Sequence, residues 1–538
     1  MTPSITCTSL SFTWPDGTPV LEDLDVAFGL GRTGLIGVNG SGKSTLLKLI
    51  AGELRPVDGT VRVTGEVGYL PQNVTLDTTL RVDDALGIAA QRAALHAIEA
   101  GDVAEAHFET VGDDWDVEER ALATLGELGL GQIGLDRTVG EVSGGESVLL
   151  RLAALLLRRP DVLLLDEPTN NLDLYARRRL RTAVGNWPGV MVVVSHDREL
   201  LELVDQIADL RSGGVTWYGG NYTAYEEALA VEQDAAERMV RVAEADLRKQ
   251  KRELTDAHLK LARRKRYGQK MWDQKREPKI IMGARKRAAQ ESAGKHRIMH
   301  EERLAGAKER LDEAVEAVRD DDEIRVDLPH TAVPPGRTVL TLTNLELAYG
   351  ARVDGGFELR GPERVALIGR NGAGKTTLLR TVAGELPPVS GEATAQVPLR
   401  FLPQRLDVLD GELSIADNVA RFAPGATNNR IRARLARFLF RGARADQKAA
   451  TLSGGERFRA TLAALMLAEP APQLLVLDEP TNNLDIAGVR QLTTALESYE
   501  GALIVAGHDL PFLESVGITR WLLMEEGQLK EIAPEAVR

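Results

Sequence analysis

Four short motifs occur twice in this 538-residue chain, in the same order each time. The first set is GVNGSGKST (37–45), SGGE (143–146), LLLDEPTNNLD (163–173) and VSHD (194–197). The second set is GRNGAGKTT (369–377), SGGE (453–456), VLDEPTNNLD (476–485) and AGHD (506–509). A repeat of this length predicts two copies of one domain, each built from the same elements in the same order.

The spacing of equivalent positions shows where the two copies differ in length. It is 332 residues between Lys43 and Lys375 but 310 between Ser143 and Ser453, so the first copy holds 22 additional residues. These fall near residues 88–115, whose composition is typical of a helix. We expect a small helical arm there, with a longer exposed loop as the alternative. The predicted domains are 1–224, which includes the arm, and 336–538, joined by 225–335.

The connecting segment has a composition of its own. Residues 225–266 contain no Pro or Gly and are rich in Ala, Leu, Glu, Lys and Arg, which favour helices. Glu277-Pro278 interrupts this pattern, and a second helical run is predicted from about residue 284 to 319. Two antiparallel helices of about 40 residues each would extend ~60 Å. The sequence therefore predicts a long helical hairpin between two α/β domains.

Composition limits the class of protein. Cys7 is the single cysteine, so an intrachain disulfide is impossible and a reducing compartment is expected. The N-terminal residues lack a basic segment followed by an apolar run, and no stretch approaches ~18 uninterrupted apolar residues. We therefore expect a cytoplasmic protein. The net charge of −13 would argue against a nucleic-acid partner if the charges were evenly spread.

The pattern GxxxxGK[ST], placed between an apolar strand and an apolar helix, is typical of a loop that binds nucleotide phosphates. Lys43 and Lys375 are expected to neutralise phosphate charge, and the hydroxyls of Ser44 and Thr376 to bind Mg²⁺. The predicted ATP-binding positions are Gly37, Asn39, Gly40, Ser41, Gly42, Lys43, Ser44 and Thr45 in the first copy, and Gly369, Asn371, Gly372, Ala373, Gly374, Lys375, Thr376 and Thr377 in the second.

Acidic and histidine side chains follow the next apolar runs. Asp166 and Asp478 end runs that are typical of buried strands, where a carboxylate can reach a metal ion. The adjacent Glu167 and Glu479 are candidates to polarise the attacking water, with a supporting role around the metal as the alternative. His196 and His508 recur at matched positions after another strand, which favours contact with the γ-phosphate. Gly507 stands where the first copy has Ser195, so the two sites could differ in activity.

Together these motifs resemble those of ABC-type ATPases, in which two cassettes meet head-to-tail. The resemblance implies that SGGE of one cassette covers ATP bound by the other, through Ser453, Gly454, Gly455 and Glu456 over the Lys43 site and Ser143, Gly144, Gly145 and Glu146 over the Lys375 site. It also implies that Gln72 and Gln404 sense Mg²⁺. Trp14 and Tyr349 would stack on adenine, although either could be a core residue and Phe12 competes with Trp14.

Positive charge gathers in the middle of the connecting segment. Residues 260–297 contain 14 Lys or Arg and 3 Asp or Glu, a net of +11. This segregation is typical of a surface that binds a phosphate backbone, with a solvated charged helix face as the alternative. Met271, Trp272 and 280–282 could stack on bases or could pack the turn. The candidate RNA-binding residues are Arg263, Arg264, Lys265, Arg266, Lys270, Lys275, Arg276, Lys279, Arg285, Lys286 and Arg287.

The whole chain resembles the ABC-F family: tandem ATPase cassettes without a membrane part, joined by a charged helical linker. The resemblance implies an ATP- and Mg²⁺-dependent ATPase that binds the ribosome. Its linker would lie near the tRNA exit site and the peptidyl-transferase region, against large-subunit rRNA and tRNA. Antibiotic protection is the expected role, and a housekeeping translation factor is the alternative. An importer subunit with separate membrane partners fits less well, and an obligate homodimer is not expected.

Overall fold

The computed structural model describes residues 2–72, 77–142, 144–185, 187–211, 213–273, 298–315, 328, 330–482 and 484–537, apart from the side chains at 264, 265, 268, 269 and 271–273. The chain divides into two compact units. One contains Met1–Thr223 and Asp322–Arg538, and the other contains Ala224–Asp321. The predicted α/β class with two cassettes and a helical linker is confirmed.

The first cassette contains two sheets. An antiparallel sheet has the order β2-β1-β4, and a six-stranded sheet has the order β5-β6-β7-β3-β8-β9, parallel except for its β8–β9 pair. The central strands read as unbroken apolar runs because both faces of the sheet are buried. The strands are β1 (Ser4–Thr13), β2 (Pro19–Phe28), β3 (Gly31–Ile36), β4 (Asp58–Thr64), β5 (Val67–Leu70), β6 (Val162–Asp166), β7 (Val190–Val194), β8 (Gln206–Arg211) and β9 (Gly214–Gly219).

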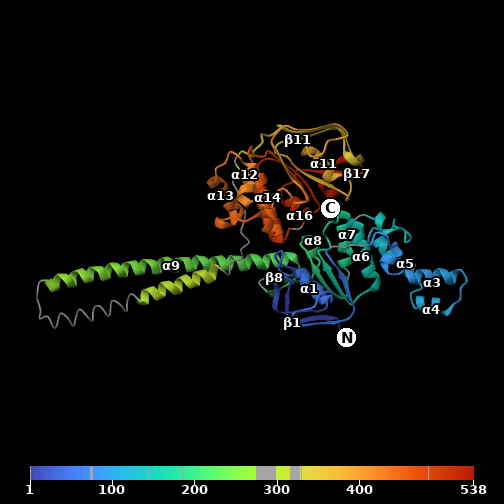
Figure 1. The fold of residues 1–538 in the computed structure, drawn as a ribbon, viewed down its shortest axis with the longest axis horizontal. Coiled ribbons are helices and arrows are strands. Elements are labelled where there is room, and N and C mark those ends of the chain that lie inside the picture. The colour runs from blue at the N-terminus through green and yellow to red at the C-terminus, as the bar shows by residue number, and fades with distance from the viewer. Residues whose placement is uncertain are drawn as a thin grey trace. The chain divides into compact units, whose positions relative to one another are not determined.

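Eight α-helices are present in the described part of the first cassette. They are α1 (Lys43–Ile50), α2 (Val82–Leu86), α3 (Ala89–Glu99), α4 (Glu105–Val111), α5 (Val117–Glu127), α6 (Gly144–Arg158), α7 (Leu174–Gly185) and α8 (Arg198–Leu201). Helices α3 and α4 occupy the stretch for which a helical arm was expected, and they lie next to each other (Figure 1).

The second cassette has one mixed sheet of nine strands, with the order β13-β10-β11-β18-β17-β12-β16-β15-β14. Its strands are β10 (Thr338–Glu346), β11 (Arg352–Arg360), β12 (Arg364–Gly369), β13 (Ser390–Ala395), β14 (Leu399–Leu402), β15 (Leu474–Asp478), β16 (Ala502–Ala506), β17 (Arg520–Glu525) and β18 (Gln528–Ile532). Its helices are α11 (Lys375–Val382), α12 (Ile415–Phe422), α13 (Asn428–Leu435), α14 (Gly454–Met466), α15 (Ile486–Glu497) and α16 (Leu510–Ser515).

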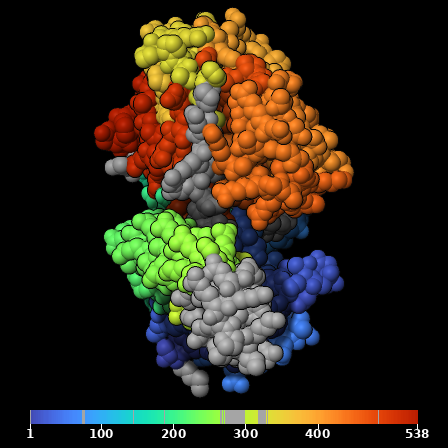
Figure 2. All heavy atoms as spheres, turned by 90° about the vertical axis from the view of Figure 1, so that its left-hand side faces the viewer, coloured from blue at the N-terminus to red at the C-terminus, as the bar shows by residue number. Residues whose placement is uncertain are grey.

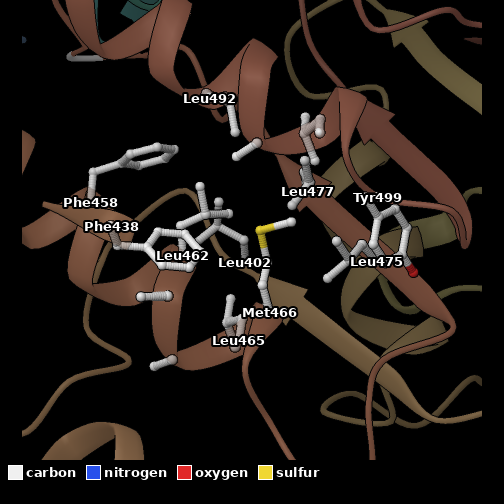
Figure 3. Packing of buried hydrophobic residues seen from close by; sticks show 14 of the residues in the cluster. Leu402, Phe438, Phe458, Leu462, Leu465, Met466, Leu475, Leu477, Leu492 and Tyr499 are labelled. Atoms are coloured by element: carbon white, nitrogen blue, oxygen red, sulfur yellow. The ribbon is translucent and has the colours of Figure 1, made fainter. Parts of the chain in front are cut away.

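Apolar packing fixes the strand that carries the predicted catalytic carboxylates of this cassette. Leu475 and Leu477 of β15 face Leu462 and Met466 of α14 in a fully buried cluster (Figure 3). Helices α12, α13 and α14 gather as one lobe of the cassette, shown in orange in Figure 2. Because β15 is buried on both faces, Asp478 and Glu479 at its end are held in a fixed position.

In its described residues, the second unit is a pair of helices. Helix α9 (Tyr222–Asp273) is 52 residues long and runs beside a helix at residues 298–315 (Figure 1). At 1.5 Å per residue α9 extends ~78 Å, so the expected length of about 40 residues was wrong for this helix. It begins within the first cassette and meets no Gly or Pro before Gly268. Arg310 Nη2 lies 2.8 Å from Asp246 Oδ2 and links the two helices.

Ion pairs occur along the exposed surface of α9. Ion pairs one helical turn apart, Arg241–Glu237 at 3.0 Å and Arg248–Glu244 at 2.6 Å, follow α9. Such pairs stabilise an exposed helix by a few tenths of a kcal/mol each, about 0.2–0.5 kcal/mol. No helix in the described part of the chain combines the length and the apolar character that a membrane crossing requires.

Candidate ATP-binding sites

Each phosphate-loop motif forms the turn between a buried strand and a helix. Gly37 and Gly369 adopt φ values of 150° and 152°, and a Cβ at either would lie 2.4 or 2.3 Å from a backbone oxygen of the neighbouring strand. Gly42 and Gly374 are left-handed N-caps of α1 and α11. Only glycine fits this path, which points the free N–H groups of a helix N-terminus at the loop. The arrangement fits an anionic phosphate chain.

The two predicted phosphate-binding lysines are buried and curl over their own loops. Lys43 Nζ donates to the carbonyl of Gly37 at 2.9 Å, and Lys375 Nζ donates to that of Gly369 at 2.9 Å. Burial lowers the pKa of both lysines, although neighbouring carboxylates oppose the shift. A buried cation held between a glycine loop and carboxylates is arranged to receive negatively charged phosphate oxygens.

The predicted magnesium ligands meet at the end of the sheet. Ser44 Oγ donates to Asp166 Oδ1 at 2.9 Å, and Asp166 is buried at the end of β6. Thr376 and Asp478 occupy the same places at α11 and β15. Burial raises the pKa of both aspartates. One hydroxyl and one carboxylate are hard oxygen donors, and Mg²⁺ typically takes one or two such protein ligands together with substrate phosphates.

Each predicted catalytic glutamate contacts its predicted histidine. Glu167 Oε1 lies 3.0 Å from His196 Nε2, and Glu479 Oε1 lies 3.1 Å from His508 Nε2. Both glutamates adopt φ 48°, an uncommon conformation for a residue with a side chain. Their backbone N–H groups donate to Val194 and Ala506, each at 2.8 Å, which fixes this turn.

Burial controls the charge of these pairs. It raises the pKa of Glu167 to about 8 and that of Glu479 to about 7, while the nearby lysine opposes each shift. It lowers the pKa of His196 to about 3 and that of His508 to about 2, so both imidazoles are neutral near pH 7. A neutral imidazole has one donor and one acceptor nitrogen. Beside a carboxylate it can therefore donate a hydrogen bond to a phosphate oxygen or exchange hydrogen bonds with water.

The residues of the second site surround a cavity of about 460 Å³, a size typical of ligand pockets. It is lined by Asn171, Leu172, Ala348, Tyr349, Ala351, Asn371, Gly372, Ala373, Gly374, Lys375, Thr376, Thr377, Gln404, Glu479, Asn482 and His508. The predicted adenine-stacking, phosphate-binding, Mg²⁺-sensing and catalytic residues of this site therefore share one space. Asn171 and Leu172 come from the first cassette.

Reciprocal contacts join each phosphate loop to the DEPTNNLD motif of the other cassette. The backbone N–H of Asn39 donates to Asp485 Oδ2 at 3.0 Å, and that of Asn371 donates to Asp173 Oδ2 at 3.2 Å. Asn371 Nδ2 also donates to the Asn171 carbonyl at 2.7 Å. Sequence reasoning quoted these aspartates without giving them a role. The sequence NLD, which recurs after each catalytic glutamate, was the one feature that could have indicated a role for these aspartates.

The remaining predicted site residues are placed as follows. Trp14 is 38% exposed and packs edge-on against Phe12, which is buried in the core, whereas Tyr349 is 94% exposed. Gln72 and Gln404 are exposed at the ends of β5 and β14. A Cβ on Gly145 would lie 3.3 Å from Asn371 Nδ2, so this signature segment approaches the second site. Ser453 caps α14, which begins at Gly454 and contains Gly455 and Glu456.

Some predicted residues lie outside the described part of the chain. Ser143 is one of them, between Val142 and the start of α6. In the hairpin, Arg263, Arg266 and Lys270 are exposed on α9. The side chains of Arg264 and Lys265, and all of Lys275, Arg276, Lys279, Arg285, Lys286 and Arg287, are outside the described residues, as are Trp272's side chain and the interruption at Glu277-Pro278.

Comparison with known proteins assigns the family. The family described as "ABC transporter" matches residues 21–170 and 354–482, one segment in each cassette. The tylosin resistance ATP-binding protein TlrC of Streptomyces fradiae is 34% identical over 535 residues, covering 92% of each chain. The energy-dependent translational throttle protein EttA of Escherichia coli (strain K12) is 30% identical, covering 96% of this chain and 91% of its own. The chain belongs to the ABC-F family.

The ABC-F assignment confirms the expected enzyme class, an ABC-type ATP hydrolase with two ATP-binding cassettes. Among solved structures, RNase-L Inhibitor aligns with 96% of this chain and 88% of its own, with a TM-score of 0.57 and 20% identity. That likeness supports the tandem-cassette fold.

Proposed function

We propose that this ABC-F protein binds the ribosome in its ATP-bound state and protects it from antibiotics. The observation that carries the proposal is the segregation of charge: a segment of net +11 (260–297) lies between two complete nucleotide sites in a chain of net −13. Lys and Arg concentrated in this way bind a phosphate backbone. The likeness to TlrC and EttA, whose names state tylosin resistance and translational throttling, supports a ribosomal partner.

The ATP sites act through the residues already described. Lys43 and Lys375 bind phosphate oxygens, and Ser44 with Asp166, and Thr376 with Asp478, hold Mg²⁺, assisted by Gln72 and Gln404. The ion offsets phosphate charge and orients the γ-phosphate when bound. Glu167 and Glu479 orient the attacking water and take its proton, while His196 and His508 hold the γ-phosphate side of the site. Trp14 and Tyr349 stack on the adenine.

ATP also closes the two cassettes on each other in this proposal. The contacts Asn39–Asp485 and Asn371–Asp173 already link each phosphate loop to the opposite cassette. The signature residues 143–146 and 453–456 supply small side chains and backbone donors to the γ-phosphate of the opposite site. Binding of two nucleotides then holds one conformation, and hydrolysis releases it.

In this proposal the helical hairpin is the part of the protein that binds the ribosome. We propose domains at 1–224, 225–335 and 336–538, with the hairpin entering the tRNA exit site and approaching the peptidyl-transferase region. Exposed Arg263, Arg266 and Lys270 contribute to an RNA-binding surface that continues through Lys275, Arg276, Lys279, Arg285, Lys286 and Arg287. Most of its affinity would be electrostatic and would fall steeply with salt.

Ribosome sedimentation tests the proposal. The Glu167→Gln/Glu479→Gln variant should bind ATP without hydrolysing it and should pellet with ribosomes in ATP but not in ADP. Changing Arg263, Arg264, Lys265 and Arg266 to Ala should abolish this association and spare the ribosome-free ATPase. The matched control changes Arg238 and Arg241, which are also exposed on α9, to Ala and should pellet normally. Fractionation of the double variant with membranes would favour an importer subunit instead.

A translation assay separates protection from housekeeping. In cell-free translation inhibited by tylosin, the wild-type protein should restore synthesis, and the variant with the Ala-substituted basic cluster should not. If the wild-type protein fails to restore synthesis in the presence of tylosin and slows uninhibited translation in an ATP-dependent way, a translation factor that resembles EttA would be favoured. If changing Arg263, Arg264, Lys265 and Arg266 to Ala leaves the ribosome affinity unchanged across a salt series, the proposed role of the basic segment in ribosome binding is refuted.

A further inference from the structure

The helices that follow the two DEPTNNLD motifs differ where they approach the other cassette. Helix α7 of the first cassette carries Tyr175 and Arg177 at positions that correspond to Ala487 and Val489 of α15, by the constant spacing of 312 residues. An aromatic ring and a guanidinium on one side are therefore matched by two small or apolar side chains on the other. Any interaction that needs these groups is confined to one of the two ATP sites.

Arg177 is buried beneath the loop that lines the second cavity. Arg177 is only 8% exposed, and its Nε donates to the Leu172 carbonyl at 3.1 Å. Its Nη1 lies 3.4 Å from Asp197 Oδ2, next to His196 of the first site. Leu172 and its neighbour Asn171 are the first-cassette residues of the second cavity. Arg177 thus joins a residue of the first site to the wall of the second.

The charge of Arg177 also reaches the second catalytic pair. Burial raises the pKa of Glu479, and Lys375 and then Arg177 oppose this shift. Burial lowers the pKa of His508, and the positive charges of Lys375 and Arg177 lower it further. A buried guanidinium in this place stabilises negative charge in the second site. Val489, which is buried at the matched position, carries no charge.

One further contact and one close approach are found on the same side. The guanidinium of Arg370, in the second phosphate loop, lies 5.6 Å from the centre of the Tyr175 ring, within cation–π range. The matched pair, Val38 and Ala487, offers neither group. A Cβ on Gly145 would contact Asn371, whereas one on Gly455 would meet nothing within 4 Å. These contacts place more of the first cassette against the second phosphate loop.

We infer that Arg177 is a positioning residue that the first cassette supplies to the second ATP site, where it holds the Asn171–Leu172 segment against the phosphate loop. The inference rests on the proposed roles of the two sites in ATP binding. Through its contact with Asp197, the same side chain links the state of the first site to the closure of the second. The contact exists on one side only, because Val489 has no charged group with which to form it. The two sites therefore bind ATP unequally, and the second is the more tightly closed.

Nucleotide binding by single-site variants tests this inference without ribosomes. Lys43→Ala leaves the second site to bind ATP, and Lys375→Ala leaves the first. In each background, the affinity and release rate of a fluorescent ATP analogue (mant-ATP) are measured with Arg177 and with Arg177→Val, the residue of the matched position. We expect about tenfold weaker binding at the second site, a size typical of coupling between sites. At the first site the change should stay below about twofold.

Two more variants separate positioning from folding. Arg177→Lys keeps the charge and should recover part of the second-site affinity. Tyr175→Ala removes a half-exposed ring, leaves folding intact, and should weaken binding about two- to fivefold at the second site only. If Arg177→Val fails to fold, Tyr175→Ala still tests whether side chains of α7 support ATP binding at the second site only. Equal effects at both sites, or no effect at either with an unchanged melting temperature, would overturn the inference. A failure to bind ribosomes would leave these nucleotide measurements unaffected.

Discussion

In the first cassette the buried guanidinium of Arg92 ties the inserted helix α3 to the domain, whereas in the second cassette a neutral amide, Asn418, organises the corresponding region. Arg92 Nη1 lies 2.9 Å from Asp83 Oδ2 and 2.7 Å from Asp136 Oδ1. Asn418 is fully buried, and its Nδ2 donates to the Asp410 carbonyl at 2.9 Å while its Oδ1 accepts from the Asp410 N–H at 2.8 Å.

The difference shows what the repeated motifs leave unspecified. Both cassettes place lysine, aspartate, glutamate and histidine in the same relation to the sheet, because the same loops end the same strands. The side chains that organise the region after β5 and β14, Arg92 and Asn418, are not repeated. A charged network accompanies the 22-residue insertion, and a compact polar turn is sufficient without it. The chemistry of the two sites is therefore shared, while their stability and closure are set separately.

The catalytic glutamates provide the largest test of this comparison. Glu167→Gln and Glu479→Gln should each lower turnover at their own site by about 10²–10⁴-fold, the usual contribution of a positioned general base. Because the supporting contacts differ, the two residual rates should also differ. Phosphate release under saturating ATP measures both. A single variant that keeps the full wild-type rate would contradict the role of its glutamate.

Breaking the Arg92 network should destabilise the first cassette. Arg92 is 9% exposed, so Arg92→Met removes a buried partner of Asp83 and should cost about 1–3 kcal/mol, since Asp83 keeps its pair with Arg81. Urea unfolding followed by tryptophan fluorescence measures this loss. The matched control is Arg137→Met, which removes an exposed pair with Glu141 and should cost less than about 1 kcal/mol. Similar losses for the two variants would show that burial does not distinguish the pairs.

Much of each cassette could be predicted from the sequence because its signals are local. The glycine loop, the buried strand that ends in Asp166, and the helix after the loop each occupy a short stretch whose pattern specifies its conformation. The fold class and the family were predicted correctly for this reason. The length of α9 was underestimated mainly at its C-terminal end, because the helix continues through Gly268 to Asp273, beyond the run that ends at residue 266.

Contacts between distant segments could not be predicted in the same way. Asn371 and Asp173 are 198 residues apart, and the sequence of neither motif predicts a contact with the other. Arg177 gave no signal because it lies in a helix rich in arginine, where one buried side chain looks like its exposed neighbours. Arg177 differs from its neighbours in that the matched position of the second cassette holds an apolar side chain, Val489.

The aromatic residues offer a smaller test of the difference between the sites. Trp14 is held against Phe12, whereas Tyr349 is almost fully exposed and must be ordered when a base stacks on it. Immobilising a side chain opposes binding by about 0.5–1.5 kcal/mol. Trp14→Ala should therefore lose more affinity than Tyr349→Ala, about 1–3 kcal/mol for a full stacking contact. Mant-ATP titration of the single-site variants measures both, and a larger loss at Tyr349 would reverse the comparison.

The smallest effect is expected at the N-terminus of α14. Ser453 Oγ accepts from the Glu456 N–H at 3.3 Å, and Glu456 Oε2 accepts from the Ser453 N–H at 3.0 Å, which together form a capping box. Ser453→Ala should lower stability by about 1 kcal/mol because it leaves an N-terminal amide without an acceptor. Thermal unfolding without nucleotide measures this, so that the proposed contact of Ser453 with ATP does not contribute.

Ser453→Asp separates the cap from the hydroxyl. An aspartate is an equally good N-cap and should keep the stability of the second cassette, while its negative charge would oppose a γ-phosphate at the Lys43 site. A variant that melts normally yet binds ATP poorly at the first site would assign Ser453 two independent roles. If Ser453→Asp melts as early as Ser453→Ala, a carboxylate does not replace the Ser453 hydroxyl as the cap of α14, and stability and ATP binding cannot be assigned to separate groups of this side chain.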